Sequence, residues 1–231
     1  MSKKQTSPKQ RQGVKRVQKR DRDATQLALI EAGETLFSRH GFSGVTLDMV
    51  AKKSGANKAL VSYYFGSKEG LYDAVIAAIV SDVVSAVSAS LDEGGDPVRN
   101  FRSYIRALAH AFAARPSFPA ILMREYIGGS MQEREGPFRQ VLQFYRMTER
   151  LYEAGRKKKV FRKLDPHKLH LSIIGPLVHF SLTIEFRART VERLSNEIGN
   201  PSVEEFSRHL ETLILDGVRR AEASVASGKS P

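Results

Sequence analysis

The sequence contains no cysteine and no tryptophan, and it lacks a long uncharged apolar run. Without cysteine the chain can form no disulfide, zinc finger or cysteine nucleophile. The longest uncharged apolar stretch, between Lys168 and Glu185, has 16 residues and two histidines, which is short of the ~20 that span a bilayer. The basic beginning leads into a segment that Glu31 and Glu34 interrupt, unlike a secretory signal. We therefore expect a cytoplasmic protein with no membrane partner.

Sequence motifs for catalysis and metal binding are also missing. The sequence has no phosphate-binding glycine loop, no G-x-S-x-G elbow and no H-E-x-x-H motif. His167 and His170 share a face of an expected helix, but His179 falls on the opposite side from His170. No carboxylate pattern completes a metal site. We expect no catalytic residue, no metal and no cofactor, and an enzyme stays the second class of function to test.

The positive charge is concentrated near the N-terminus. The chain has 37 lysines and arginines against 25 acidic residues, a net charge of +12, and residues 1–23 account for +7 with nine basic and two acidic residues. Residues 46–68 add +3, and the chain from Glu69 onward is close to neutral. Because residues 1–22 have almost no apolar side chains, we expect a disordered basic arm. It is either a solubilising tail, a segment that follows DNA phosphates, or a contact to anionic lipid, for which it lacks Trp, Phe and Leu to insert.

The rest of the sequence predicts an all-α fold. Apolar residues recur at helical spacing, glycines and prolines separate the segments, and no long stretch alternates with period two. The expected helices cover residues 24–39, 47–53, 58–64, 68–91, 97–114, 118–131, 137–158, 166–189 and 202–225. Within 166–189, Gly175-Pro176 predicts a kink, which either shapes a cavity or fits the packing.

Residues 46–65 combine the features of a helix-turn-helix. Ala51 is small enough for the crossing of the two helices, and Gly55 can take the positive φ that the turn needs. Val61 and Phe65 lie one helical turn apart and are expected to anchor the second helix in the core. The outward face that remains can enter a DNA major groove. It is formed by Lys58, Ala59, Ser62 and Tyr63.

Residues 24–72 resemble the DNA-binding domain of TetR-family repressors. The resemblance rests on Leu29-Ile30-Glu31-Ala32-Gly33-Glu34-Thr35-Leu36-Phe37, His40-Gly41-Phe42, Val45-Thr46, Val50-Ala51, Ser54-Gly55-Ala56-Asn57-Lys58 and Tyr63-Tyr64-Phe65-Gly66-Ser67-Lys68-Glu69-Gly70-Leu71. It implies a helix-turn-helix DNA-binding domain over 23–68, a helical ligand-binding and dimerisation domain over 69–226, and a disordered tail over 227–231. It also implies an Ω-shaped homodimer, a repressor that binds a palindromic operator in double-stranded DNA and is released by a small-molecule effector.

The resemblance also implies roles for individual residues. Thr46 and Lys68 match positions that contact phosphate, and Tyr64 matches a position that usually contacts the DNA backbone, although Tyr64 can also serve to cover the helix crossing. The sequence departs from the family where Ser62 replaces a frequent Tyr and Leu60 replaces a frequent Thr. The recognition helix then carries Asn57, Lys58, Ala59, Ser62 and Tyr63.

The second domain is expected to pair with a copy of itself and to hold the effector. The helix 202–225 has one broad apolar stripe, and the helix before it is apolar almost all round. Both serve either the monomer core or, as the resemblance implies, a four-helix dimer interface. Candidate residues for an effector pocket are polar or aromatic groups among apolar ones. They are Tyr104, His110, Arg124, Tyr126, Phe144, Met147, His170 and His179.

Overall fold

The structure is a computed structural model that describes residues 8–128, 135–193 and 199–219, so the expected tail over 227–231 lies outside the described residues. Over these ranges it consists of ten helices, and its only β pairing is an isolated bridge between Phe161 and Arg219. The all-α prediction is therefore confirmed. The helices are α1 (Pro8–His40), α2 (Leu47–Ser54), α3 (Lys58–Phe65), α4 (Lys68–Ala89), α5 (Pro97–Ala114), α6 (Ser117–Gly128), α7 (Glu135–Lys157), α8 (Pro166–Leu182), α9 (Ile184–Arg193) and α10 (Val203–Val218).

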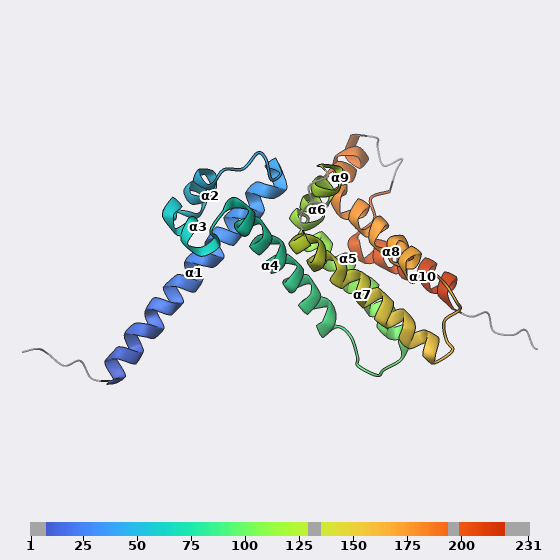
Figure 1. The fold of residues 1–231 in the computed structure, drawn as a ribbon. Coiled ribbons are helices and arrows are strands. Elements are labelled where there is room, and N and C mark those ends of the chain that lie inside the picture. Colours follow the sequence, from blue (N-terminus) through green and yellow to red (C-terminus); the bar gives the residue numbers. More distant parts are fainter. Residues whose placement is uncertain (1–7, 129–134, 194–198, 220–231) are drawn as a thin grey trace, which may run out of the picture.

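The helices form two groups that α4 connects (Figure 1). The short helices α2 and α3 lie beside α1 at one end of the molecule, and α5–α10 form a bundle at the other end. α4 begins against α1 and α3 and then packs on α5 and α7 of the bundle. A single continuous helix thus joins the predicted DNA-binding end to the predicted ligand domain.

The first helix is longer than the sequence predicts. It begins at Pro8 rather than near residue 24, so residues 8–22 are helical where we expected an arm without secondary structure. Lys, Arg and Gln, which dominate this segment, are good helix formers. Extending an existing helix also costs much less than nucleating a new one. Asp23 and Gln26 have the spacing of a capping box, which predicted the start near residue 24, but α1 runs through both residues.

The small domain, formed by α1–α3 and the start of α4, is held together by aromatic packing around Tyr72. Tyr72 contacts Phe37 at a ring-centroid distance of 4.8 Å and Phe42 at 5.2 Å, both edge to face. Gly33 allows the close approach of α1 and α4, because a Cβ there would lie 3.0 Å from a methyl carbon of Val75. This packing fixes α4 against α1, and it sets the base on which α2 and α3 rest.

α4 by itself has the length and composition of a membrane-spanning helix. Within the protein, however, it is a core helix with apolar side chains that include Leu71, Val75, Ile79 and Val83 buried against α1, α5 and α7. Core helices of globular domains combine length and hydrophobicity in the same way. The hydrophobicity of α4 is thus accounted for by packing.

The bundle departs from the sequence prediction at residues 166–189. The chain forms two helices there, α8 and α9, with a bend of 57° between them. The expected kink at Pro176 does not end the helix, because Pro176 lies inside α8. The break falls at Thr183, whose hydroxyl donates to the His179 carbonyl at 2.7 Å, while Arg187 donates to the freed Phe180 carbonyl at 2.7 Å.

Candidate nucleic-acid interface

The helix-turn-helix forms where the sequence places it. Thr46 caps α2 by accepting a hydrogen bond from the backbone N–H of Met49, and Asn57 caps α3 by accepting one from Ala59. Gly55, between the helices, has φ = +71°, a left-handed conformation that glycine adopts without steric cost. Val61 is fully buried beneath α3. The caps, the turn and the anchor together fix the angle at which α3 is presented.

The outward face of α3 agrees with the prediction. The four residues expected there, Lys58, Ala59, Ser62 and Tyr63, are all exposed. The Tyr63 side chain is 70% exposed, which leaves both its ring and its hydroxyl available to a partner. Leu60 is also exposed, so that face combines one cation, two hydroxyls and apolar surface. Such a mixture can contact phosphates, base edges and the thymine methyl group.

An ion pair at this face was not foreseen from the sequence. Lys58 Nζ lies 2.7 Å from Asp48 Oδ2, and both side chains are more than half exposed. Asp48 is in the first turn of α2 and Lys58 in the first turn of α3. Because the helix-turn-helix brings these two first turns together, the opposite charges at the two helix starts were the available signal. The pair orients the Lys58 ammonium before any DNA is bound.

Two further candidates are Thr46, which caps α2, and Tyr64, which lies in the last turn of α3. Thr46 is exposed, and although its hydroxyl accepts from Met49 it can still donate its proton to a phosphate oxygen. Tyr64 is half-buried, packs against the core, and meets the Tyr63 ring at a centroid distance of 5.2 Å. Tyr64 is therefore partly a core residue, and its ring supports the exposed ring of Tyr63 beside it.

Lys68 lies differently from what the sequence led us to expect. Its Nζ donates to the carbonyl oxygens of Phe42 and Val45, at 3.1 Å each, and sits 4.3 Å from the centroid of the Phe42 ring. The ammonium is thus engaged inside the domain. To make the phosphate contact predicted for it, Lys68 would have to leave these acceptors.

Polar contacts connect the small domain to the bundle. Arg115, after α5, donates to both carboxylate oxygens of Glu34 on α1, at 2.8 and 2.6 Å, and to Asp82 on α4 at 2.5 Å. These carboxylates raise the pKa of Arg115 above its ordinary value, with the Glu34 hydrogen bonds as the largest cause. Ser117 also donates to Glu34, and Arg124 donates to the carbonyl of Ser38.

Four of the eight candidate effector residues lie in the interior of the bundle. Tyr104, Phe144 and Met147 are buried, and His170 is partly buried. The Tyr104 hydroxyl is 2.8 Å from Thr148 Oγ1, which is 2.9 Å from His170 Nδ1. Burial lowers the pKa of His170 to about 4 and raises that of Tyr104. The structure thus forms a neutral polar chain across α5, α7 and α8, with Thr148 as the link that the sequence prediction missed.

The other four candidates lie elsewhere, so the predicted set does not line one pocket. His110 pairs with Glu204 on α10, Arg124 reaches α1, and Tyr126 and His179 are exposed. A cleft of about 700 Å³ lies instead between α1, the start of α6 and the junction of α8 and α9, and none of the eight lines it. Periodicity could not separate these residues, because it reports which face is apolar and not which groups meet.

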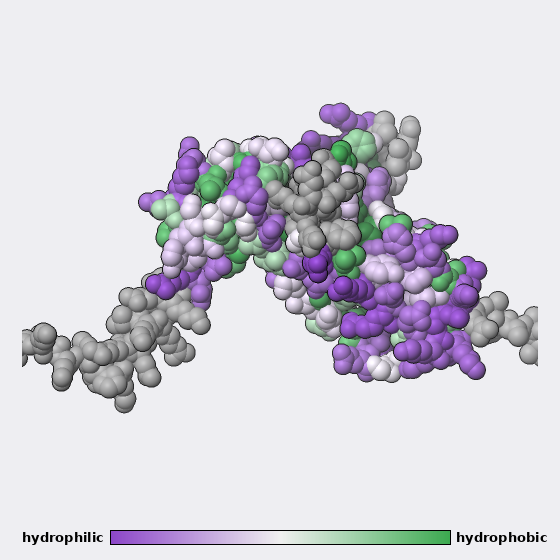
Figure 2. Space-filling model, in the orientation of Figure 1, coloured by the Kyte–Doolittle hydropathy of each residue, from purple (hydrophilic) through white to green (hydrophobic). Residues whose placement is uncertain are grey.

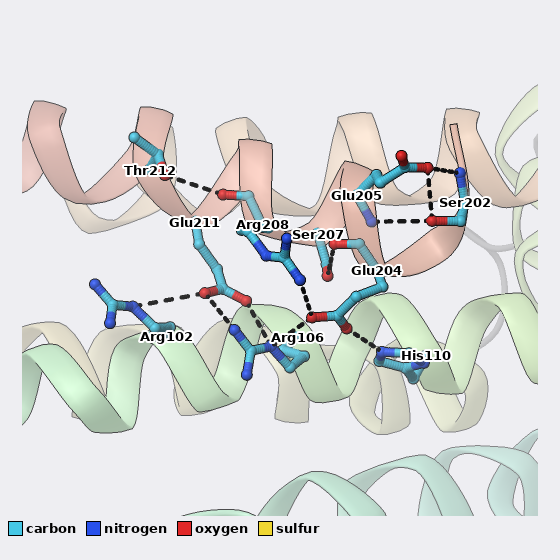
Figure 3. A network of polar contacts seen from close by, with 10 residues as sticks. All are labelled: Arg102, Arg106, His110, Ser202, Glu204, Glu205, Ser207, Arg208, Glu211 and Thr212. Carbon is cyan, nitrogen blue, oxygen red and sulfur yellow. Dashed lines mark hydrogen bonds and ion pairs between the residues drawn. The ribbon is translucent and has the colours of Figure 1, made fainter. Parts of the chain in front are cut away.

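A polar network fastens α10 to α5 (Figure 3). Arg106 donates to both oxygens of Glu211, at 2.9 and 3.0 Å, and the Arg102 guanidinium lies 3.5 Å from the same carboxylate. Glu211 is 2% exposed. Glu204, one end of the network, binds His110 and Arg208, and these hydrogen bonds lower its pKa. α10 is therefore held on the bundle by charge as well as by apolar packing.

Comparisons with known proteins agree with this arrangement at both ends of the chain. The family model described as bacterial regulatory proteins, tetR family, matches residues 29–75, and that described as tetracyclin repressor-like, C-terminal domain, matches residues 97–217. The chain is 28% identical over 213 residues to the HTH-type transcriptional regulator RutR of Escherichia coli K12, covering 89% of this chain and 97% of RutR. It is 25% identical over 142 residues to the HTH-type transcriptional repressor NicS of Pseudomonas putida, covering 61% of this chain and 67% of NicS.

Among solved structures, the fatty acid degradation regulator FadR of Bacillus halodurans shares the fold. Its TM-score is 0.65 at 15% identity, and the match covers 92% of this chain and 97% of FadR. The C-terminal family model alone spans more than half of the chain, and the N-terminal model coincides with the helix-turn-helix described above. The chain therefore belongs to the TetR family, and it is a DNA-binding transcriptional regulator.

Proposed function

We propose that this regulator is a cytoplasmic repressor that binds a palindromic operator as a homodimer and is released by a small-molecule effector. The observation that carries the proposal is the exposed face of α3, with Lys58, Ala59, Ser62 and Tyr63 projecting from a rigidly capped helix. Side chains placed in this way can reach base edges in a major groove. Thr46, at the start of α2, and Tyr64, near the end of α3, would contact the phosphate backbone.

The homodimer is supported by apolar surface that remains exposed on the bundle. Leu171 on α8 and Leu213 on α10 are 56% and 60% exposed, and Leu182 is also exposed. By contrast, the bundle face over α7 is largely hydrophilic (Figure 2). A second copy that covers the leucines of α8 and α10 would bury them and would present two recognition helices to successive turns of one DNA face.

The effector site is proposed for the interior of the bundle, around Tyr104, Phe144, Met147 and His170. These buried residues combine apolar side chains with a few convergent polar groups, which is the composition of small-molecule sites. Because the cleft of about 700 Å³ lies elsewhere, an effector would have to displace packed side chains to enter here. An uncharged, partly aromatic molecule suits the site best, because Tyr104 and His170 are both neutral there at pH 7. No enzymatic step is proposed for these residues.

The test is selection of DNA by the purified protein from a pool of random duplexes. We expect a palindromic consensus, and we expect Lys58→Ala and Tyr63→Ala to lower affinity for it by at least about 10-fold each. Lys157→Ala is the matched control, since Lys157 is an exposed lysine at the far end of α7. Enrichment of no duplex, or equal losses in all three variants, would reject the DNA-binding surface. Placing the selected duplex between a promoter and a reporter then distinguishes repression from activation.

A further inference from the structure

Lys68 occupies a position where a cation needs specific acceptors. It is the first residue of α4, and the N-terminal end of a helix carries partial positive charge that disfavours a cation. Its Nζ is held by the carbonyl oxygens of Phe42 and Val45 and by the face of the Phe42 ring. These three acceptors compensate the ammonium inside the domain. The ammonium is therefore already engaged by acceptors within the domain.

The segment that Lys68 holds is the connection between α1 and α2. Residues 41–46 lie outside any helix and lead directly into α2 through Thr46. Phe42 packs on Tyr72, and Val45 is 1% exposed, so the two carbonyls belong to residues that are already anchored in the core. Lys68 joins this connection to α4 across more than twenty residues of sequence. The position of Thr46 thus depends on α4 through this ammonium as well as through the packing of Phe42 on Tyr72.

We propose that Lys68 is a positioning residue for DNA binding, which acts through Thr46 and does not itself neutralise a phosphate. By donating to the Val45 carbonyl, it holds the start of α2 in the position from which the Thr46 hydroxyl reaches the DNA backbone. The inference rests on the proposed DNA-binding surface and assigns Lys68 a role within it. It replaces the phosphate contact that the sequence resemblance implies for this lysine.

The salt dependence of binding separates the two roles. Each phosphate contact made by a cation contributes about 0.9 to the slope of log K against log salt. Lys68→Met removes the ammonium but keeps the length of the side chain, and we expect an affinity loss of roughly 10-fold with the slope unchanged. Lys58→Met, the matched control, should lower the slope, because it removes an exposed cation from the face of α3 that meets the DNA. A slope decrease for Lys68→Met equal to that of Lys58→Met would overturn the inference.

A double-mutant cycle tests whether the effect passes through Thr46. If Lys68 positions Thr46, then Lys68→Met should weaken binding of the selected duplex strongly in the wild-type background and little in Thr46→Ala. Additive losses would mean that the two residues act independently and would contradict the mechanism. Circular dichroism and thermal unfolding of each variant establish that the affinities are those of folded proteins.

Lysine reactivity in the wild-type protein gives a test that needs no variant. With an amine-reactive reagent, the Lys68 ammonium should be much less reactive than that of Lys58 in the free protein. Lys68 is partly buried and bound to two carbonyls, whereas the Lys58 side chain, although paired with Asp48, is 55% exposed. Adding the selected duplex should protect Lys58 and leave the low reactivity of Lys68 unchanged. High reactivity of Lys68 in the free protein that disappears on DNA binding would refute its positioning role. The free-protein measurement stands even if no duplex is selected, which would refute the proposed function instead.

Discussion

Replacing Arg106 should lower the free energy of unfolding more than breaking an exposed ion pair does. The replacement leaves the buried carboxylate of Glu211 without its main partner. Glu211 has a side chain that is 3% exposed and receives two hydrogen bonds from Arg106. Arg106→Met keeps most of the aliphatic stem and removes both bonds. The remaining partner is the Arg102 guanidinium, at 3.5 Å.

The size of the effect follows from the burial of the two partners. Breaking a fully buried ion pair by removing one partner costs about 3–5 kcal/mol. The Arg106 side chain is 43% exposed and Arg102 stays close to Glu211, so solvent and the second guanidinium reduce the loss to about 2 kcal/mol in the free energy of unfolding. For a protein of this size, that corresponds to a decrease in Tm of about 4–8 °C.

Urea and thermal unfolding at one fixed protein concentration measure the effect, since association also contributes to apparent stability. Arg208→Met is the control, because its partner Glu204 has a side chain that is 42% exposed, and its cost should stay below about 0.5 kcal/mol. Glu211→Leu added to Arg106→Met should recover most of the loss, since it removes the unpaired charge. Equal costs for Arg106→Met and Arg208→Met, or a further loss in the double variant, would refute the reasoning.

Three other changes test different parts of the molecule. Deleting residues 1–22 should flatten the slope of log K against log salt, by up to about 0.9 for each phosphate that the segment neutralises. An unchanged slope would mean that residues 1–22 do not contact the DNA. Leu213→Glu should give monomers in sedimentation experiments at micromolar concentration, because it places an unpaired charge in the proposed interface. Burial holds the pKa of His170 at about 4 in the folded state, below its ordinary 6.5, so the unfolded state binds more protons between these values. Stability should be complete above about pH 6.5 and fall toward pH 4 by at most about 1.4 kcal/mol per pH unit. His170→Asn should remove this dependence, and replacing the exposed His209 in the same way should retain it.

The elements that the sequence predicts well are those with local signals. The caps Thr46 and Asn57, with the turn residue Gly55 between them, mark the start of α2 and the turn before α3, and the predicted boundaries agree with the structure to within a residue or two. Each signal acts over at most four residues, through a side chain or a permissive φ, and is visible in the sequence. Pro176 also gave a local signal: it predicted a kink, and α8 runs through it from Pro166 to Leu182.

Long-range contacts escaped prediction because nothing in the sequence marks both partners. Arg115 and Glu34 are 81 residues apart, and Arg106 and Glu211 are 105 apart. α8 ends before Thr183, whose hydroxyl and backbone N–H both donate to the His179 carbonyl, yet many helices contain threonine without a break. The effector candidates divided for the same reason, since an apolar face does not reveal which polar groups converge behind it.

The same contacts limit how the proposed effector could move the DNA-binding helices. Arg115 binds Glu34 on α1 and Asp82 on α4, so one guanidinium holds both helices that carry the helix-turn-helix. Asp82 is 67% exposed and Glu34 only 12%, so separating Arg115 from Glu34 is the step that costs free energy. An effector can supply that free energy only by binding more tightly to the state in which the pair is open. Arg115→Met should therefore make release from DNA easier at a given effector concentration, and if the effector dose needed for release is unchanged, the pair takes no part in the coupling.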